Sequence, residues 1–442
     1  MRQKVCFDAG WQFHEGELPV PQSAYKGYMY THAKTVRAIT GPAAPDYSVK
    51  GWINSDNWEP VSLPHDYVIR HVPEKTNNET LGFLPYNNSW YRKNFKLEPG
   101  DRDKRLTLLF DGVATQATVW VNGCLMAHNF CGYTPFEIDF TDVANLDGDN
   151  SVTVHVETDD HEGWWYEGGG IYRHVWLVKT PLASVDTWGL FVHAERRSDS
   201  LWECTVETTL RNDTFAALDL AVTATLENAA GKIIATAQTD ARLERKAKLA
   251  VNQTLPVASP ELWDTEHPNL YTVRVKVVSP AGEDECTTRT GFREVVFDPD
   301  KGLLLNGTPT KIKGVCCHGD YGLTGKAVPD NIQRHRVRLL REMGANGYRC
   351  AHYPQAEATL DALDEHGFLV MAESRWFEST KEGIEQLETL IRRDRNHPSV
   401  IMRSLGNEEP LFTKPEGKRI LETLYAVAKR LDPFRPVMTA VD

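Results

Sequence analysis

The last third of the chain alternates short apolar segments with amphipathic helical segments. This alternation is typical of βαβ units, which build a parallel sheet flanked by helices. No glycine-rich phosphate-binding fingerprint follows any expected strand, so the pattern favours a TIM barrel over a doubly wound sheet. The expected strands are residues 310–317, 346–351, 368–373, 399–407 and 435–442, and the expected helices are residues 329–344, 356–367, 382–396 and 415–432.

These elements make only part of a barrel, because a TIM barrel has eight strands and eight helices. The two outer strands of such a partial sheet would leave unpaired backbone groups and an exposed apolar interior. We therefore expect either self-association into a homo-oligomer that covers these edges or a poorly ordered C-terminal part.

Two regions of β-structure are expected before the barrel. The first contains short alternating segments such as RLTLLFDGV and SVTVHVET, separated by turn-forming clusters such as LDGDN, which is typical of a jelly roll. The second contains about seven candidate strands and fits an immunoglobulin-like sandwich without its disulfide. The predicted organisation is a jelly-roll β-sandwich in residues 1–181, an immunoglobulin-like β-sandwich in residues 182–296 and a partial TIM barrel in residues 297–442.

Length and charge limit the function classes. A chain of 442 residues has room for about three domains. The net charge of -12 argues against a nucleic acid or an anionic membrane as partner, and no apolar run reaches the roughly 18 residues of a membrane-spanning helix. The N-terminus has no apolar core of signal-peptide length, and the eight cysteines lack paired zinc-site spacing. We expect a reduced, cytoplasmic protein.

Polar side chains follow four of the expected barrel strands. The active site of a TIM barrel lies at the C-terminal ends of its strands, so these side chains should converge on one site. In chain order they are His318 and Asp320, then Arg349, His352 and Tyr353, then Glu373 and Arg375, and finally Asn407 and Glu408.

Structural roles compete with functional ones at several of these positions. His318 and His352 fit hydrogen-bonded core histidines as well as ligands of a substrate. Arg349 could pair structurally with Glu373, and Glu409 fits a solvated loop residue. The aromatic segment GWWYEGGGIYR could form either a sugar-stacking platform or part of the sandwich core or a domain-interface plug.

Several motifs resemble those of family 2 glycoside hydrolases, and most closely those of the β-galactosidases. They are RDRNHPSVIMRSLGNE, NGYRCAHYP, KGVCCHGDYG, EGGGIYRHVWL and SLPHDY. The resemblance covers essentially the whole chain, and the order of the three expected domains matches that of the family. It implies hydrolysis of a β-linked galactoside, with sugar recognition assisted by the jelly roll.

The resemblance also implies a role for individual residues. Glu408 matches the general acid/base, and Asn407 matches the amide that holds the sugar 2-hydroxyl. His352 and His318 match histidines that contact the substrate. Arg349 matches the arginine that hydrogen-bonds the nucleophilic carboxylate. We expect burial in the barrel to raise the pKa of Glu408 and keep it protonated.

The sequence departs from the family pattern in four respects. Arg403 stands where the family usually has Trp, and Cys317 stands where Arg is common. The segment AESRWFEST lacks the Glu-x-His magnesium element of bacterial β-galactosidases, which argues against a catalytic Mg²⁺; no other metal site is expected. The family nucleophile follows the seventh barrel strand, whereas the acidic residues after Glu408 sit beside the motif, on the following helix or its end, or at the chain terminus; they are Glu409, Glu416, Glu422, Asp432 and Asp442.

We therefore expect no nucleophile in this chain and no turnover by the chain alone. Two sets of alternatives stay open. A β-glucuronidase or a β-mannosidase shares the domain architecture, and a glucuronidase needs cationic groups for the substrate carboxylate. The chain could instead be a non-catalytic carbohydrate-binding fragment that uses the GWWYEGGGIYR segment.

Overall fold

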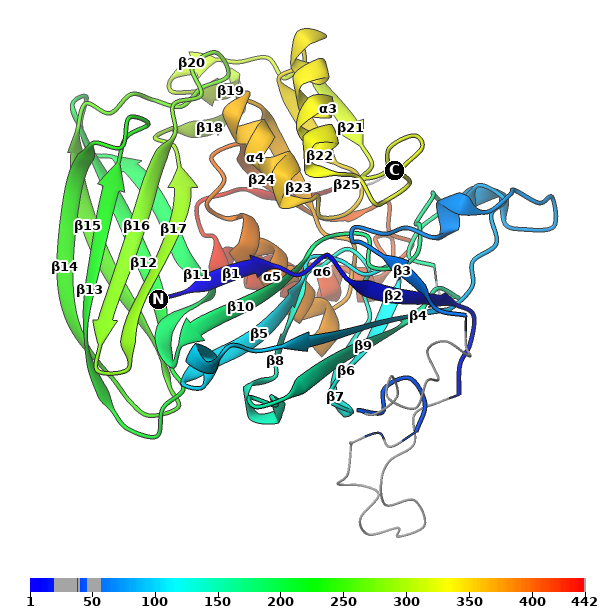
Figure 1. Cartoon of the computed structure of the whole chain (residues 1–442). Coiled ribbons are helices and arrows are strands. Elements are labelled where there is room, and N and C mark those ends of the chain that lie inside the picture. Colours follow the sequence, from blue (N-terminus) through cyan, green and yellow to red (C-terminus); the bar gives the residue numbers. More distant parts are fainter. Residues whose placement is uncertain (20–37, 39, 46–56, 160, 441–442) are drawn as a thin grey trace. The chain divides into compact units, whose positions relative to one another are not determined.

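The structure is a computed structural model that describes residues 1–19, 38, 40–45, 57–159 and 161–440 (Figure 1). The chain forms two compact units. The sandwich unit contains Gln3–Lys179 and Gly319–Pro329, and the barrel unit contains Met1–Arg2, Thr180–His318 and Asp330–Asp442. Asp442, named above among the acidic residues, lies outside the described residues.

The sandwich unit is built from two antiparallel sheets, as predicted for a jelly roll. Apolar side chains alternate along its strands, so that Ala117, Val119 and Val121 are buried while their neighbours are partly exposed. The strand order is β1-β10-β5-β8 in one sheet and β3-β2-β4-β9-β6-β7 in the other. The strands are β1 (Gln3–Cys6), β2 (Trp11–Glu15), β3 (Glu59–Val61), β4 (Ser89–Lys96), β5 (Lys104–Phe110), β6 (Gln116–Val121), β7 (Cys124–Asn129), β8 (Phe136–Asp139), β9 (Asp149–Glu157) and β10 (Val175–Pro181).

The immunoglobulin-like part of the barrel unit has seven strands in the described chain, as predicted. Every second residue of strand β12 is buried, which places one face of its sheet on the core. The sheets have the orders β11-β12-β15 and β14-β13-β16-β17. The strands are β11 (Ala183–Arg196), β12 (Leu201–Asn212), β13 (Leu218–Glu227), β14 (Ile233–Leu243), β15 (Lys248–Ala258), β16 (Tyr271–Ser279) and β17 (Gly282–Thr290).

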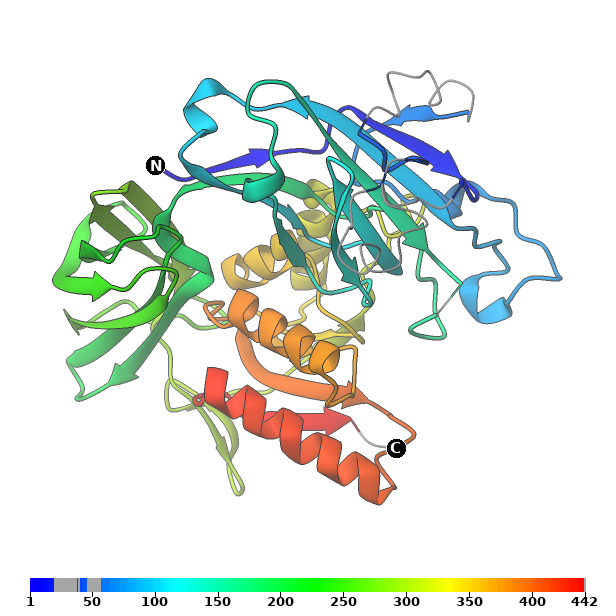
Figure 2. The same ribbon diagram turned by 90° about the horizontal axis from the view of Figure 1, so that it is seen from below.

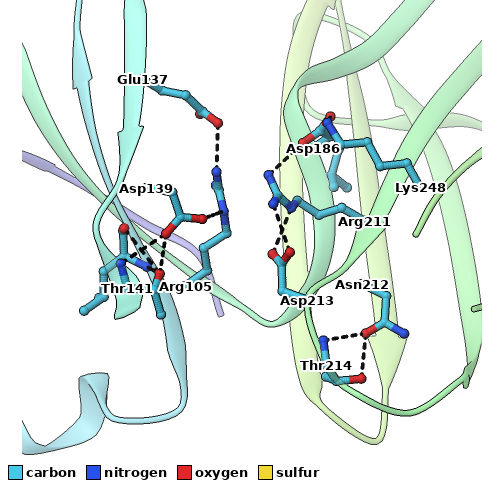
Figure 3. Close-up of polar contacts among 12 residues, drawn as sticks. Arg105, Glu137, Asp139, Thr141, Asp186, Arg211, Asn212, Asp213, Thr214 and Lys248 are labelled. Atoms are coloured by element: carbon cyan, nitrogen blue, oxygen red, sulfur yellow. Dashed lines mark hydrogen bonds and ion pairs between the residues drawn. The ribbon is translucent and has the colours of Figure 1, made fainter. Parts of the chain in front are cut away.

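Arginines tie strands together within each unit, and Figure 3 shows one example from each. In the sandwich unit, Arg105 of β5 donates to Asp139 and Glu137 of β8, both at 2.8 Å. In the barrel unit, Arg211 of β12 pairs with Asp186 of β11 at 3.3 Å and with Asp213 at 2.8 Å. Each arginine therefore adds side-chain bonds to a pair of strands already joined by backbone hydrogen bonds.

The rest of the barrel unit begins with a short antiparallel sheet and continues as a five-stranded parallel sheet. Leu303 and Leu305 of the short sheet pack with Leu369 and Ile401, which lie at the amino ends of their strands. The parallel sheet has the order β21-β22-β23-β24-β25. Its elements, with those of the short sheet, are β18 (Val295–Asp298), β19 (Gly302–Leu305), β20 (Thr308–Pro309), β21 (Gly314–Cys317), α3 (Asp330–Glu342), β22 (Gly347–Cys350), α4 (Glu357–Glu365), β23 (Leu369–Glu373), α5 (Lys381–Asp394), β24 (Val400–Asn407), α6 (Pro415–Leu431) and β25 (Val437–Ala440).

The predicted strand–helix alternation is confirmed, and the structure forms part of a TIM barrel. Figure 2 shows α5 (orange) beside α6 (red), and both bury apolar side chains against Leu405 of β24. In the described chain β21 and β25 are the two outer strands, because each pairs with one neighbour. None of the described helices has the length and apolar character needed to span a membrane.

The buried arginine of β24 has a local explanation. Arg403, which replaces the usual aromatic residue, is 2% exposed and donates to Asp432 at 3.1 and 3.2 Å. Arg435 donates to the same carboxylate at 2.9 Å. Burial opposes the charge of Asp432, but Arg435 and Arg403 outweigh it and hold the pKa of Asp432 well below its usual range. The charge on this barrel strand is therefore compensated at the end of α6.

The eight cysteines all lie in the described chain and are all free. Burial raises the pKa of the Cys131, Cys204 and Cys350 thiols, so these three behave as small buried apolar residues. Cys6 and Cys316 are exposed.

Candidate active site

The carboxyl ends of β22, β23 and β24 place a polar cluster around one carboxylate. Glu373 ends β23 and is fully buried, with 0% of the residue exposed. Arg349, on β22, donates to it from Nε at 3.1 Å and from Nη2 at 2.8 and 3.1 Å. Nδ1 of His352 lies 2.8 Å from Oε1 of the same carboxylate. Glu373 is therefore the centre of the cluster.

The ion pair between Arg349 and Glu373 has the geometry that offsets desolvation. Burying two charges is costly unless the contact is direct and the remaining polar atoms find partners. Here Nε and Nη2 of the guanidinium both donate to Glu373, and His352 makes a further hydrogen bond to the same carboxylate. Burial opposes the charge of Arg349, but the hydrogen bond and charge of Glu373 outweigh it and raise the pKa of Arg349. The structural pairing considered for Arg349 is thus present.

Asn407, the last residue of β24, is connected to the same cluster. Its Oδ1 accepts from Nη2 of Arg349 at 2.6 Å, and only 5% of the residue is exposed. Its backbone N–H donates to the carboxylate of Glu409 at 3.1 Å. Because Arg349 can only donate, the contact assigns the oxygen of the amide to the arginine side. The amide nitrogen of Asn407 then faces away from Arg349.

Glu408 follows Asn407 but differs from the expectation of a buried acid. The residue is exposed, and its backbone N–H donates to the carbonyl of Ala440 in β25 at 3.0 Å. Its φ of 52° lies in the left-handed region, which costs a residue with a side chain about 1–2 kcal/mol. The expected burial of Glu408 is therefore wrong, because the buried strand ends at Asn407 and the left-handed turn carries the next side chain to solvent.

Glu409 is less exposed than a solvated loop residue would be. Burial raises the pKa of Glu409, while Arg375, 3.7 Å away, and the backbone N–H of Asn407 act in the opposite direction. This carboxylate caps the backbone where β24 ends, so the sequence interpretation of Glu409 as a solvated loop residue is wrong.

The two predicted histidines lie close to each other. The rings of His318 and His352 pack edge to face with centroids 5.4 Å apart. Tyr353 packs on His318 at a centroid distance of 5.7 Å, and its hydroxyl lies 3.5 Å from Nδ1 of His318. His318 directly follows β21, so side chains after four neighbouring strands gather at the carboxyl edge of the sheet.

Glu373 is the residue whose importance the sequence did not reveal. Its position after the third strand and its pairing with Arg349 were considered from the sequence, but nothing indicated that the same carboxylate also contacts His352. A strand-end carboxylate one strand away from both an arginine and a histidine was the available signal.

One group of potential metal ligands occurs in the described chain. Asp361, Asp364 and His397 have ligand atoms within 4.8 Å of one another. Nδ1 of His397 lies 2.6 Å from Asp364, whose second oxygen accepts from the backbone N–H of Ser399 at 3.0 Å. Asp361 is paired with Arg289 at 2.5 Å. These contacts explain the group as polar contacts that connect α4 to the segment just before β24 and to Arg289 of β17.

The aromatic segment GWWYEGGGIYR belongs to the sandwich unit and divides between the two predicted roles. Trp164 is 60% exposed, as a stacking platform would require. Trp165 donates from Nε1 to the hydroxyl of Tyr133 at 3.0 Å, and the hydroxyl of Tyr166 donates to Asp66 at 2.7 Å. The latter two rings are therefore part of the internal hydrogen-bond network of the unit.

Comparison with known proteins identifies three family models along the chain. The sugar binding domain of glycosyl hydrolases family 2 matches residues 60–181, the family 2 glycosyl hydrolase domain matches residues 185–293, and the family 2 TIM barrel domain matches residues 298–381 and 374–442. The matched ranges correspond to the jelly roll, the immunoglobulin-like sandwich and the partial barrel.

Similar proteins carry two different activities in their names. The β-galactosidase BoGH2A of Bacteroides ovatus is 33% identical over 428 residues, which are 92% of this chain and 46% of that protein. A putative β-glucuronidase of Formosa agariphila is 30% identical over 408 residues, covering 89% of this chain and 38% of that protein. The chain thus spans about half the length or less of these relatives.

Solved structures agree in fold. A glycosyl hydrolase family 2 member from Bacteroides cellulosilyticus superposes with a TM-score of 0.85 at 30% identity, covering 99% of this chain and 57% of that one. A β-glucuronidase from Bacteroides uniformis superposes with a TM-score of 0.80 at 27% identity, covering 99% and 52%. The three domains, their order and the strand-end motifs therefore place this chain in glycosyl hydrolase family 2.

Proposed function

We propose that the chain is part of a retaining glycoside hydrolase that cleaves terminal β-galactosides, with Glu408 as general acid/base. The observation that carries the proposal is the hydrogen bond from Arg349 to Asn407, directly beside Glu408. This hydrogen bond holds the Asn407 amide in place to contact the sugar, and the next residue, Glu408, carries the carboxyl group that transfers the proton. Glycoside cleavage requires that proton on the leaving oxygen.

The neighbouring residues have complementary roles in this proposal. Asn407 holds the 2-hydroxyl of the sugar, a contact that strengthens as the transition state forms. His352 and His318 contact other hydroxyls, which suits groups that can either donate or accept. Glu408 reaches solvent, so after it has given its proton to the leaving oxygen it can accept one from the water that attacks in the second step of a retaining reaction.

The second carboxylate of a retaining reaction stands roughly 5–5.5 Å from the acid/base and attacks the sugar carbon. Glu373 is a poor candidate, because it is fully buried and its oxygens are occupied by Arg349 and His352. Glu409 is half-buried and accepts from the backbone of Asn407. We therefore propose that the described chain supplies no nucleophile and does not turn over substrate alone. In a longer polypeptide Arg349 would also support the nucleophile.

A neutral sugar is favoured over a uronic acid by the charges at the site. A glucuronide would need a cation for its own carboxylate. Arg349 is already paired with Glu373, and Arg375 lies 3.7 Å from Glu409. The remaining groups, an amide and two imidazoles, suit hydroxyls. A β-glucuronide is the second candidate, because relatives named β-glucuronidase match the chain over a similar length; a β-mannoside is the third.

The experiment compares aryl β-galactoside, β-glucuronide and β-mannoside with the 442-residue chain, measuring both binding and release of the aryl alcohol. Binding is followed by tryptophan fluorescence. Binding of the galactoside in preference to the others, without release, supports the proposal. Preferential binding of the glucuronide overturns the substrate class. Binding that survives Asn407→Ala but is lost in Trp164→Ala favours a non-catalytic carbohydrate-binding module in the sandwich unit.

A further inference from the structure

Glu373 has contacts that the proposed chemistry does not use. Its carboxylate is fully buried at the end of β23 and is hydrogen-bonded by Arg349 of β22 and by His352, which follows β22. A carboxylate in that position cannot approach a substrate. It can, however, fix the orientation of the Arg349 guanidinium and determine which ring nitrogen of His352 carries the hydrogen.

We propose that Glu373 is a positioning residue that sets the tautomer of His352 and, through Arg349, the orientation of the Asn407 amide. The inference rests on the proposed function for its purpose, since these are the groups assigned to the sugar. Its structural content stands independently, because it concerns hydrogen positions in the chain without substrate.

The tautomer of His352 follows from its contact with Glu373. A carboxylate can only accept hydrogen bonds, so Nδ1 of His352, 2.8 Å from Oε1, must carry the hydrogen. In a neutral imidazole the other nitrogen, Nε2, then has the lone pair. His352 is therefore preset to accept a hydrogen from a sugar hydroxyl at Nε2. Without Glu373 the ring could adopt either tautomer.

The orientation of the Asn407 amide depends on Arg349. The guanidinium is planar, and its Nε and Nη2 atoms are both held on Glu373 at 3.1 and 2.8 Å. This fixes the plane in which Nη2 also reaches Oδ1 of Asn407 at 2.6 Å. The amide then presents its NH₂ group on the other side, where it can donate to a sugar oxygen. One carboxylate thus prepares an acceptor on His352 and a donor on Asn407.

The test uses the full 442-residue chain labelled with ¹⁵N at histidine and asparagine side chains, and it needs no substrate. At alkaline pH, long-range ¹H–¹⁵N spectra report which ring nitrogen carries the proton. We expect wild-type His352 to show the Nδ1–H tautomer. Glu373→Gln should shift the population toward Nε2–H, because the amide that replaces the carboxylate can donate as well as accept. It should also broaden or move the Asn407 NH₂ signals.

Two variants sharpen the result. Glu373→Asp keeps the carboxylate and should retain the Nδ1–H tautomer, which also keeps the test available if Glu373→Gln does not fold. Glu409→Gln removes a nearby carboxylate that accepts from the backbone N–H of Asn407, and should leave the tautomer unchanged. An Nε2–H tautomer in the wild type, or the same tautomer in Glu373→Gln as in the wild type, overturns the inference. Failure of the glycosides to bind overturns the proposed function and leaves the tautomer result standing.

Discussion

Nη2 of Arg349 lies 2.8 Å from Glu373 and 2.6 Å from Oδ1 of Asn407, so one guanidinium nitrogen joins the ends of three neighbouring strands. The strand-end residues are therefore coupled, and the stability of the barrel unit and the arrangement of the site depend on the same contacts.

Replacement of Arg349 should destabilise the chain through the charge that it leaves behind. Removing one partner of a buried ion pair costs about 3–5 kcal/mol, so Arg349→Ala should lower the free energy of unfolding by that amount, reduced to the extent that His352 still binds Glu373. Arg349→Lys keeps the charge but loses the two-nitrogen contact, and should fall between Ala and wild type. Urea denaturation measures both. Equal stability of all three proteins would show that the pair is not important for folding.

The ion pairs of Asp432 with Arg403 and Arg435 should contribute to the free energy of unfolding by an amount that depends on pH. The pKa of Asp432 is lowered in the folded state, so its stabilisation is complete above the unfolded pKa of about 3.9 and is lost as pH falls below that value. Asp432→Asn should cost about 3–5 kcal/mol at neutral pH and less in acid. Urea denaturation of Asp432→Asn and the wild type at neutral pH and at an acidic pH measures the two losses.

The matched control is Asp219→Asn, because Asp219 pairs with Arg242 on the surface, where such pairs contribute about 0–1 kcal/mol. A constant loss for Asp432→Asn across the pH range would contradict the assigned cause.

The left-handed backbone of Glu408 predicts an unusual response to glycine. At φ 52° glycine removes about 1–2 kcal/mol of strain and adds about 0.5–1 kcal/mol of unfolded-state entropy. Glu408→Gly should therefore keep or slightly raise the thermal midpoint. Glu422→Gly, at an exposed position in α6, should lower stability by about 1 kcal/mol. Equal losses in the two variants would contradict the strain.

Lys326 in the sandwich unit should make stability rise with pH above neutrality. Burial lowers the pKa of Lys326 to about 7, although Asp320, Glu167 and Asp66 oppose this and Arg173 reinforces it. A folded pKa below the unfolded value of about 10.4 means that the unfolded chain binds more protons between these values, so stability increases with pH there.

Lys326→Met should flatten this rise, by up to about 2 kcal/mol between roughly pH 7 and pH 9. Urea midpoints of both proteins across that range provide the test. Lys93, whose pKa is lowered to about 8 by burial, contributes with the same sign in both proteins and so cancels in the comparison. Parallel pH profiles would contradict the assignment to Lys326.

Local patterns were sufficient to predict the elements of the barrel. Strand–helix alternation predicted every helix and strand between Gly314 and Ala440 within a few residues, because each apolar segment was bounded by turn or cap residues. The pattern extended the first helix to residue 344, which is two residues beyond the end of α3, and Met343 there is 67% exposed. The helix ends at Glu342, so helical spacing no longer applies to Met343.

The sequence predicted which residues gather at the candidate site but not the conformation and exposure of each one. The strand-end rule gathered Arg349, His352 and Asn407 correctly, since the carboxyl ends of parallel strands meet at one edge. It could not reveal the exposure of Glu408, which follows from a single backbone angle. Nor could it predict that the segment Gly319–Pro329, which follows His318, belongs to the sandwich unit, because that depends on long-range contacts of Lys326 with Asp66.

The most direct test of the account is hydrolysis and binding of an aryl β-galactoside by the purified 442-residue chain. The account predicts that the galactoside binds, that Asn407→Ala abolishes binding, and that no aryl alcohol is released above the rate of the buffer. Release of aryl alcohol by the wild-type chain that disappears in Glu408→Gln would contradict the claim that this chain carries the general acid/base of a glycosidase without its nucleophile.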